Sequence, residues 1–255
     1  MVTTQYRETQ VATNRHEPVI AQGLLSDVLI VTPEPPARTD SGNGGSRPNL
    51  PGADCSVVDA LQARLHVLVS SCGDALSRAV QHLEGEDSWV IGPLPNCGPL
   101  AEEVEAAARA VLAHSHLNAQ ETESVAEVLK SAGDLRAAAR GARQAVQLAH
   151  LIRTDAAGRE ALETVSPLGD AALALARATG DALSSNDPVA ARNAALRYRA
   201  VDAARQAAER ELRSPHGAAL FAPTMVRMVR ASLWHLAVAG ESMARVAARA
   251  AARVN

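Results

Sequence analysis

The sequence predicts an all-α protein built from two tandem three-helix bundles. The chain has 255 residues, of which 47% are apolar but only 2% aromatic, so its core must consist mainly of Ala, Leu and Val. Ala and Leu are strong helix formers, and the alternation of apolar and polar residues that indicates strands is nearly absent. Residues 73–76 and 180–183 both have the sequence Gly-Asp-Ala-Leu, 107 positions apart, and the order of helices around them recurs. Such a repeat predicts a fused pseudo-dimer, which is more often a binding scaffold than an enzyme.

The first 53 residues differ in composition from the rest and are predicted to be a non-helical or disordered N-terminal extension. Proline and glycine are concentrated in residues 33–53, which is typical of a flexible linker. Two interpretations of the apolar stretch at 19–31 stay open: a short helix or strand packed on the helical body, or a segment that docks a partner. The predicted domains are residues 1–53, 54–153 (first bundle) and 162–255 (second bundle).

The first bundle opens with a helix whose apolar residues recur at alternating steps of four and three, the pattern of a bundle helix. These residues are Leu61, Leu65, Leu68, Cys72, Ala75 and Ala79. Glycines and prolines in the segment 92–99 then break the chain, and Glu102, Glu103 and Glu105 favour the positive end of the second helix. The predicted helices cover about 55–84, 100–114 and 119–153.

The helices of the second bundle are predicted from their start signals. Ser166-Pro167 and Asp187-Pro188 each combine a capping side chain with a proline suited to the first helical position. A turn at 214–217 separates the last two helices, and Pro223 favours a slightly later start of the final one. The predicted helices cover about 167–185, 188–213 and 218–253.

Composition also narrows the class of protein. The net charge of −3 and the pI near 6.2 lack the positive excess of a nucleic-acid-binding protein. Cys55, Cys72 and Cys97 have no metal-ligand spacing and fit a reducing compartment, with Cys72 expected to be a buried apolar residue. The sequence contains no apolar stretch long enough to span a membrane and no secretory signal. We therefore expect a cytoplasmic protein that does not bind nucleic acid.

No motif in the sequence predicts catalysis. A phosphate-binding Gly-x-x-x-x-Gly-Lys-Ser/Thr loop, a Gly-x-Ser-x-Gly nucleophile elbow and Glu-x-x-His pairs are all missing from the sequence. His114 and His116 are two positions apart and so lie on different sides of a helix, which favours surface residues over metal ligands. His235 beside Trp234 is expected to be an interfacial or partly buried pair. We therefore expect no enzymatic activity and no catalytic residue.

Arginines recur at helical spacing on two segments. Arg136, Arg140 and Arg143 share one side of the third helix, and Arg245, Arg249 and Arg253 share one side of the last. One interpretation is a solvated helix surface whose arginines are partly paired, with the terminal group also favouring the negative helix end. The other is a binding surface for an anion or an acidic partner, because guanidinium groups bind carboxylate and phosphate in a bidentate way.

Three segments have the pattern of a known family. Residues 186–191 have the form x-Asp-x-x-x-Ala at the opening of a helix, and Val201-Asp202 follows with an apolar and an acidic residue. Residues 119–149 have the residue spacing of a third bundle helix. In these features the chain resembles the PhoU family of phosphate-signalling regulators, which consist of two tandem three-helix bundles. The resemblance covers about residues 55–255.

The third helix of that family usually carries Leu-Glu-Arg-Ile-Gly-Asp, whose two acids can bind metal clusters. We compare this motif with residues 135–140 and 236–241. The positions of the acids are then Arg136, Arg140, Ala237 and Glu241. Arginine cannot replace the oxygen ligands that hard cations and iron prefer, so the comparison implies lost metal sites and no cofactor. Either the arginines supply positive charge where the family holds a cation, or the surface has lost that role.

The resemblance implies a cytoplasmic regulator of phosphate uptake and phosphate-starvation signalling. Its implied partners are the ATPase of a phosphate ABC transporter and a sensor histidine kinase, so it would meet the membrane only through partners, and it allows a homodimer. The candidate partner- or anion-binding residues are Arg136, Arg140, Arg143, Arg245 and Arg249. Two alternatives stay open: a diverged helical adaptor for another membrane transporter or channel, and a metal-binding helical bundle.

Overall fold

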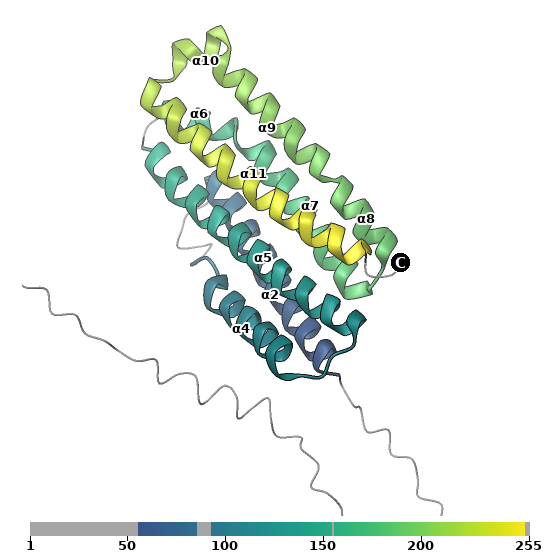
Figure 1. The fold of residues 1–255 in the computed structure, drawn as a ribbon. Helices are drawn as coiled ribbons and strands as arrows, with labels where there is room; N and C mark the ends of the chain where they lie inside the picture. The colour runs from purple at the N-terminus through teal and green to yellow at the C-terminus, as the bar shows by residue number, and fades with distance from the viewer. Residues whose placement is uncertain (1–55, 86–92, 155, 253–255) are drawn as a thin grey trace, which may run out of the picture. The chain divides into compact units, whose positions relative to one another are not determined.

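The computed structural model describes residues 56–85, 93–154 and 156–252, and every regular element in these ranges is an α-helix (Figure 1). The helices are α2 (Val57–Glu84), α4 (Cys97–His114), α5 (Ala119–Ile152), α6 (Ala156–Glu163), α7 (Ser166–Ser185), α8 (Pro188–Leu196), α9 (Tyr198–Arg213), α10 (Pro215–Leu220) and α11 (Pro223–Ala252). The predicted all-α class is confirmed. The predictions for the N-terminal extension, its linker and the apolar stretch 19–31 lie outside the described residues, as does Arg253.

The four helices α2, α5, α11 and α7 pack in a ring, each against the next. The short α4 packs on α5 and α2, while α8 and α9 pack on α7 and α11. Figure 1 shows α5 and α11 side by side along most of their length. Their interior is apolar: Leu68, Leu135, Leu236 and Met243 have no exposed surface. Burial of such side chains is the main favourable term in folding.

Two long helices begin with reciprocal caps that the sequence analysis did not single out. At the start of α2, the Ser56 hydroxyl accepts from the Asp59 backbone N–H at 3.2 Å, and the Asp59 carboxylate accepts from that of Ser56 at 3.1 Å. Asn118 and Glu121 make the same pair of bonds at the start of α5, both at 2.9 Å. Each pair satisfies two backbone donors that the helix itself leaves free.

The apolar pattern predicted for the first helix is confirmed. All six predicted core positions of α2 are at most 3% exposed, Cys72 among them. The second helix starts earlier than predicted, at Cys97, because a proline two residues later is tolerated in a first turn. Its first turn therefore holds no acidic residue, and the expected contribution of Glu102, Glu103 and Glu105 to that turn was wrong.

The prediction of one continuous helix over 188–213 was wrong. The backbone N–H of Arg197 bonds to the carbonyl of Ala194 at 3.0 Å, a tighter turn than the α-helical one, and the chain divides there into α8 and α9. The predicted start is correct: Asp187 caps α8 by accepting from the Val189 backbone N–H at 2.8 Å.

Three other boundaries differ from the prediction. Val165, and not Ser166, is the N-cap of α7, since the Ser166 hydroxyl donates to the carbonyl of Leu162 at 3.5 Å. The segment predicted as a turn after residue 213 forms the short α10, because the Ser214 hydroxyl accepts from the Gly217 backbone N–H at 3.0 Å. The last helix begins at Pro223, and α6 was not predicted. No helix in the described ranges has the length and apolar content needed to cross a membrane.

Candidate functional site: the charged contact between α5 and α11

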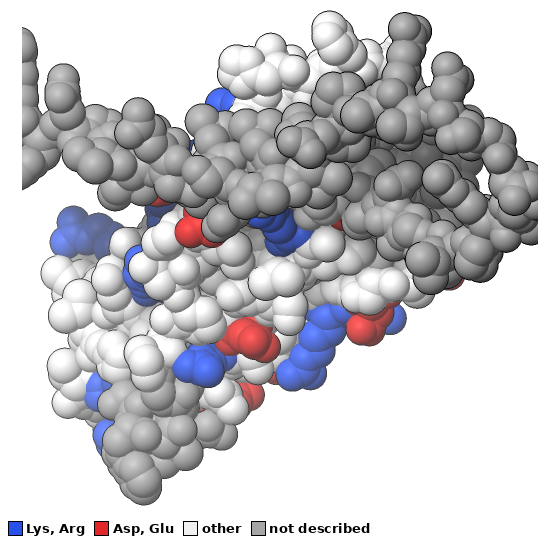
Figure 2. Space-filling view, turned by 90° about the horizontal axis from the view of Figure 1, so that it is seen from below, with Lys and Arg blue, Asp and Glu red and all other residues white. Residues whose placement is uncertain are grey.

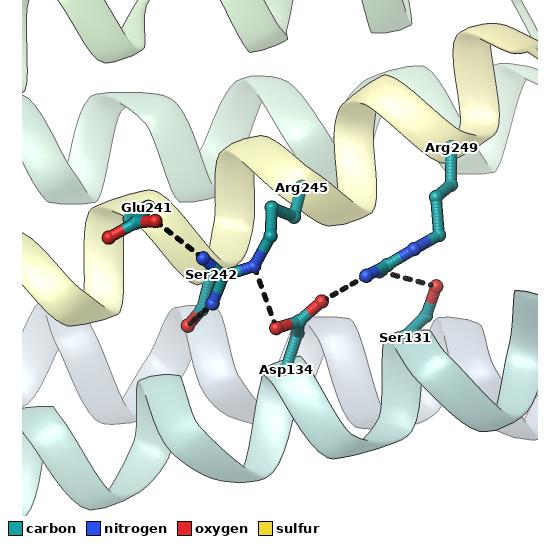
Figure 3. A network of polar contacts seen from close by, with 6 residues as sticks. All are labelled: Ser131, Asp134, Glu241, Ser242, Arg245 and Arg249. Atoms are coloured by element: carbon teal, nitrogen blue, oxygen red, sulfur yellow. Dashed lines mark hydrogen bonds and ion pairs between the residues drawn. The ribbon is translucent and has the colours of Figure 1, made fainter.

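Asp134 of α5 binds two arginines of α11 (Figure 3). Its carboxylate accepts from Nε of Arg245 at 2.9 Å and from Nη2 of Arg249. Arg249 also donates to the hydroxyl of Ser131, one turn earlier on α5, at 3.4 Å. The Asp134 side chain is 14% exposed and that of Arg249 is 22% exposed, so solvent screens this pair less than a surface pair. The contact fixes the position of α11 along α5.

Arg245 also bonds to its own helix. Its Nη1 lies 2.6 Å from the Glu241 carboxylate, and its Nη2 donates to the Ser242 hydroxyl at 3.1 Å. All three contacts of this guanidinium group are visible in Figure 3. One arginine therefore binds two acids, Asp134 from α5 and Glu241 from α11.

These two acids are equivalent in the internal repeat. Asp134 and Glu241 are 107 positions apart, the same offset as the two Gly-Asp-Ala-Leu tetrads, and each follows an Ala-Gly pair. This offset aligns residues 129–134 with residues 236–241. The family motif was compared above with residues 135–140, which begin six residues later than 129–134. Sequence reasoning therefore missed Asp134, although the offset contained the signal. An Ala-rich helix gives few landmarks by which to choose between such registers.

A second buried acid lies between α4 and α5. Glu105, with a side chain only 5% exposed, binds Nη2 of Arg109 at 2.8 Å and Nη2 of Arg136 at 3.2 Å. Arg136 also approaches the exposed Glu102 at 3.9 Å. In the sequence, these glutamates indicate only favourable charges near a helix start. The structure shows that Glu105 faces inward and that Arg136 is a partner of α4.

The structure separates the five candidate arginines. Arg245 and Arg249 bind α5, Arg136 binds α4, and Arg143 donates to the Asn96 side chain at 3.0 Å. Arg140 is exposed and makes no ion pair within the described part of the chain. Of the five, Arg140 is thus the exposed arginine with neither a carboxylate nor an amide partner among the described residues.

Arg140 lies beside the closest approach of α5 and α11. A Cβ on Gly141 would lie 2.5 Å from the backbone carbonyl oxygen of His235, so only glycine allows this crossing. The neighbouring Trp234 is 62% exposed, and its ring stacks edge-on against that of His235 with 4.8 Å between centroids. Burial lowers the pKa of His235. Trp234 and Arg140, the residues just before His235 and Gly141 in the sequence, are thus both exposed next to this crossing point.

The two Gly-Asp-Ala-Leu tetrads meet in a shallow hollow of about 300 Å³ between α2 and α7. Gly73 and Asp74 line it from α2, and Gly180 and Asp181 line it from α7. The sequence repeat is thus also a spatial relationship. The glycines leave the hollow open: a Cβ on Gly73 would meet no atom within 4 Å.

The surface carries both signs of charge. Figure 2 shows basic and acidic side chains interspersed on one face of the molecule, with much of that face white. Many of the arginines have carboxylate neighbours one helical turn away, as in the pairs of Arg205 with Asp202 and Glu209 at 2.9 and 2.8 Å. On this face, the described residues do not form a continuous basic stripe (Figure 2).

Comparison with known proteins identifies the fold. No protein-family model and no curated protein matches the chain. Among solved structures, the chain is similar to the crystal structure of PhoU from Pseudomonas aeruginosa, with a TM-score of 0.63 and 18% sequence identity. The match covers 78% of this chain and 97% of that one. The protein therefore has a PhoU-like helical fold.

The acids at these places are already bound to arginines. Asp134 and Glu241 bind Arg245, and Glu105 binds Arg109 and Arg136, so a guanidinium group already neutralises each of these buried or motif acids. Within the described ranges, no three His, Cys, Asp or Glu residues come close enough to hold a metal ion together. A metal cation at either place would have to displace a bound arginine, and the two positive charges would repel each other.

Proposed function

We propose that this protein is a PhoU-like regulator without catalytic activity, which acts in phosphate uptake and phosphate-starvation signalling by binding other proteins. The observation that carries the proposal is the similarity of the whole helical body to PhoU, joined to the arginine-bound acids of α5 and α11. These fixed charges give the body a defined electrostatic surface without a cofactor. The regulator would act through different affinities for two states of its partner.

The solvent side of α5 and α11 supplies the docking surface in this proposal. Tryptophan and arginine are the residue types that most often dominate protein–protein binding energy. Trp234 and Arg140 are both exposed, and each directly precedes one of the two residues that meet at the crossing, His235 and Gly141. Arg136, Arg143, Arg245 and Arg249 then have a supporting role, because their contacts hold α4 and α11 in place against α5.

The proposed partners are the ATPase of a phosphate ABC transporter and a sensor histidine kinase, so the protein would be cytoplasmic. Acidic groups on the partner surface would complement Arg140. A homodimer is compatible with this proposal but is not needed for it.

One alternative has a specific observation in its favour. In the register of the repeat, Lys130 and Ala237 stand at the first acidic position of the two family motifs, and no family model matches the chain. These departures favour a diverged adaptor that serves another membrane transporter or channel through the same surface. A metal-binding bundle remains the third candidate, and metal analysis of the purified protein tests it: stoichiometric iron, manganese or zinc would overturn the proposal.

The test of the proposed function is a phosphate-responsive reporter in the native host, grown in high phosphate with and without this gene. We expect deletion to activate the reporter and the wild-type gene to restore repression. Trp234→Ala and Arg140→Glu should fail to restore it, whereas Arg177→Glu, an exposed arginine at the hollow between α2 and α7, should succeed. An unchanged reporter in a strain without paralogues would refute the phosphate assignment and leave the adaptor.

A further inference from the structure

The short helix α8 exposes its larger apolar side chains and buries its smaller ones. Ala191 and Ala194 are each 1% exposed, whereas Val189 and Leu196 are 63% and 50% exposed. A surface helix normally turns its larger apolar residues inward, because their burial contributes more to the free energy of folding. The packing of α8 on α7 and α11 therefore leaves two aliphatic side chains in solvent, and the proposed function uses neither.

The two exposed aliphatic residues lie on one side of α8, with an arginine between them. Residues three and seven positions apart share a side of a helix, so Val189, Arg192 and Leu196 project in about the same direction. All three are exposed, and this side is opposite to the alanines that pack on the helical body. Figure 1 shows α8 and α9 at the edge of that body.

Three arginines at this place have no carboxylate partner among the described residues. Arg192 lies on α8, Arg197 is its C-cap, and Arg199 is in the first turn of α9. All three side chains are exposed. Residues 188–201 contain these arginines and no acidic residue, although the whole chain has a net charge of −3. The break between α8 and α9 is therefore a local concentration of positive charge.

The acids nearest to these arginines in the sequence are engaged elsewhere. The Asp187 carboxylate accepts from the backbone N–H of Val189 at 2.8 Å, at the opposite end of α8. Asp202 binds Arg205 at 2.9 Å, and Glu209 binds the same guanidinium group at 2.8 Å. The positive charge at the break is thus available to an external anion.

We propose that the α8 surface, formed by Val189, Arg192, Leu196, Arg197 and Arg199, binds directly to an anionic lipid membrane. Its guanidinium groups pair with lipid phosphates, while the two aliphatic side chains enter the boundary between headgroups and acyl chains. This contact is additional to the protein partners proposed above and does not depend on them.

The side chains of the α8 surface fit a lipid membrane better than a protein partner. Leucine and valine are under-represented among the residues that dominate protein–protein binding. Apolar side chains flanked by arginines are instead typical of helices that lie in a membrane interface. Arginine keeps its charge and binds phosphate in a bidentate way, and each cationic side chain near an anionic leaflet adds attraction.

The test is co-sedimentation of the full chain with vesicles made of equal parts of phosphatidylglycerol and phosphatidylcholine. We expect binding that weakens as salt is raised, and much weaker binding to vesicles of phosphatidylcholine alone. Arg192→Gln, Arg199→Gln and Leu196→Ser should each lower the affinity about fivefold. Because these positions are exposed, the variants should keep the unfolding midpoint of the parent.

Two control variants lie outside the α8 surface. Arg64→Gln, at an exposed arginine of α2, and Trp234→Ala should leave vesicle binding unchanged. Equal binding to neutral and anionic vesicles, or no binding to either, would overturn the proposal. Loss of binding in Trp234→Ala but not in the three α8 variants would also overturn it. Poly-L-glutamate tests for an acidic protein partner: if it binds through Arg192 while anionic vesicles do not bind, the partner is a protein and the lipid proposal is wrong.

Discussion

Asp134 and Glu241, which are 107 residues apart in the chain, bind the same guanidinium group, that of Arg245. Because they are equivalent in the internal repeat, Arg245 bonds one acid from each half of the molecule. Ion pairs to one acid from each copy of the repeat therefore stabilise the α5–α11 contact, in addition to apolar packing.

Removing the Asp134 carboxylate should destabilise the protein. Asp134→Asn leaves Arg245 with only Glu241 as its carboxylate partner and leaves Arg249 with no carboxylate partner among the described residues. We expect the free energy of unfolding to fall by about 1–3 kcal/mol, measured by urea denaturation. Asp181→Asn, at an exposed position of α7, is the control and should change it by less than about 0.5 kcal/mol. Equal losses in the two variants would show that the α5–α11 ion pairs contribute nothing.

Alanine substitutions at two glycines should have opposite effects on the free energy of unfolding. Gly141→Ala places a Cβ 2.5 Å from a backbone carbonyl of α11 and must push the helices apart, which should cost at least about 1–3 kcal/mol. Gly73→Ala meets no atom within 4 Å and should stabilise α2 by about 0.5–1 kcal/mol, because alanine is the better helix former. Thermal unfolding of both variants checks this, and a stable Gly141→Ala would contradict the crossing geometry.

Reversing the charge at Arg136 should matter far more than at Arg140. Arg136→Glu places a third carboxylate beside Glu105 and Glu102, and Glu105 is buried. We expect a loss of about 1–3 kcal/mol in the free energy of unfolding, which higher salt partly restores. Arg140→Asp should stay within about 0.5 kcal/mol of the parent. If the two variants lost equal stability, Arg136 would not be the partner of Glu105.

Protonation of His235 should weaken the fold. Its pKa is lowered by burial, so the folded state binds the proton less readily than the unfolded chain does. The free energy of unfolding must then decrease as pH falls through the unfolded value of about 6.5. His235→Gln should lose less stability than the parent between about pH 7.5 and 5.5. Parallel pH profiles for the two proteins would refute this role.

The sequence predicted features formed by neighbouring residues of one helix better than contacts between side chains of different helices. The buried side of α2, the Asp187 cap and the pairing of Trp234 with His235 followed from helical spacing and adjacency. Asp134 and Glu105 were missed, because an acid on an Ala-rich helix can equally face water or a neighbouring helix. Asp134 binds arginines of α11, and Glu105 binds one arginine of α4 and one of α5.

By itself, the sequence determined the helical class, the repeat and, to within two residues, the starts of α2, α5, α7 and α8. Caps, breakers and apolar spacing act within a few residues of each other. Only the tertiary structure decided which arginines are free. The bond between Arg245 and Asp134 joins residues 111 positions apart. Elsewhere along the same pair of helices, Gly141 lets α5 and α11 approach closely. Helical periodicity places a guanidinium group on one side of a helix, but the packing of a second helix decides whether it meets a carboxylate or water.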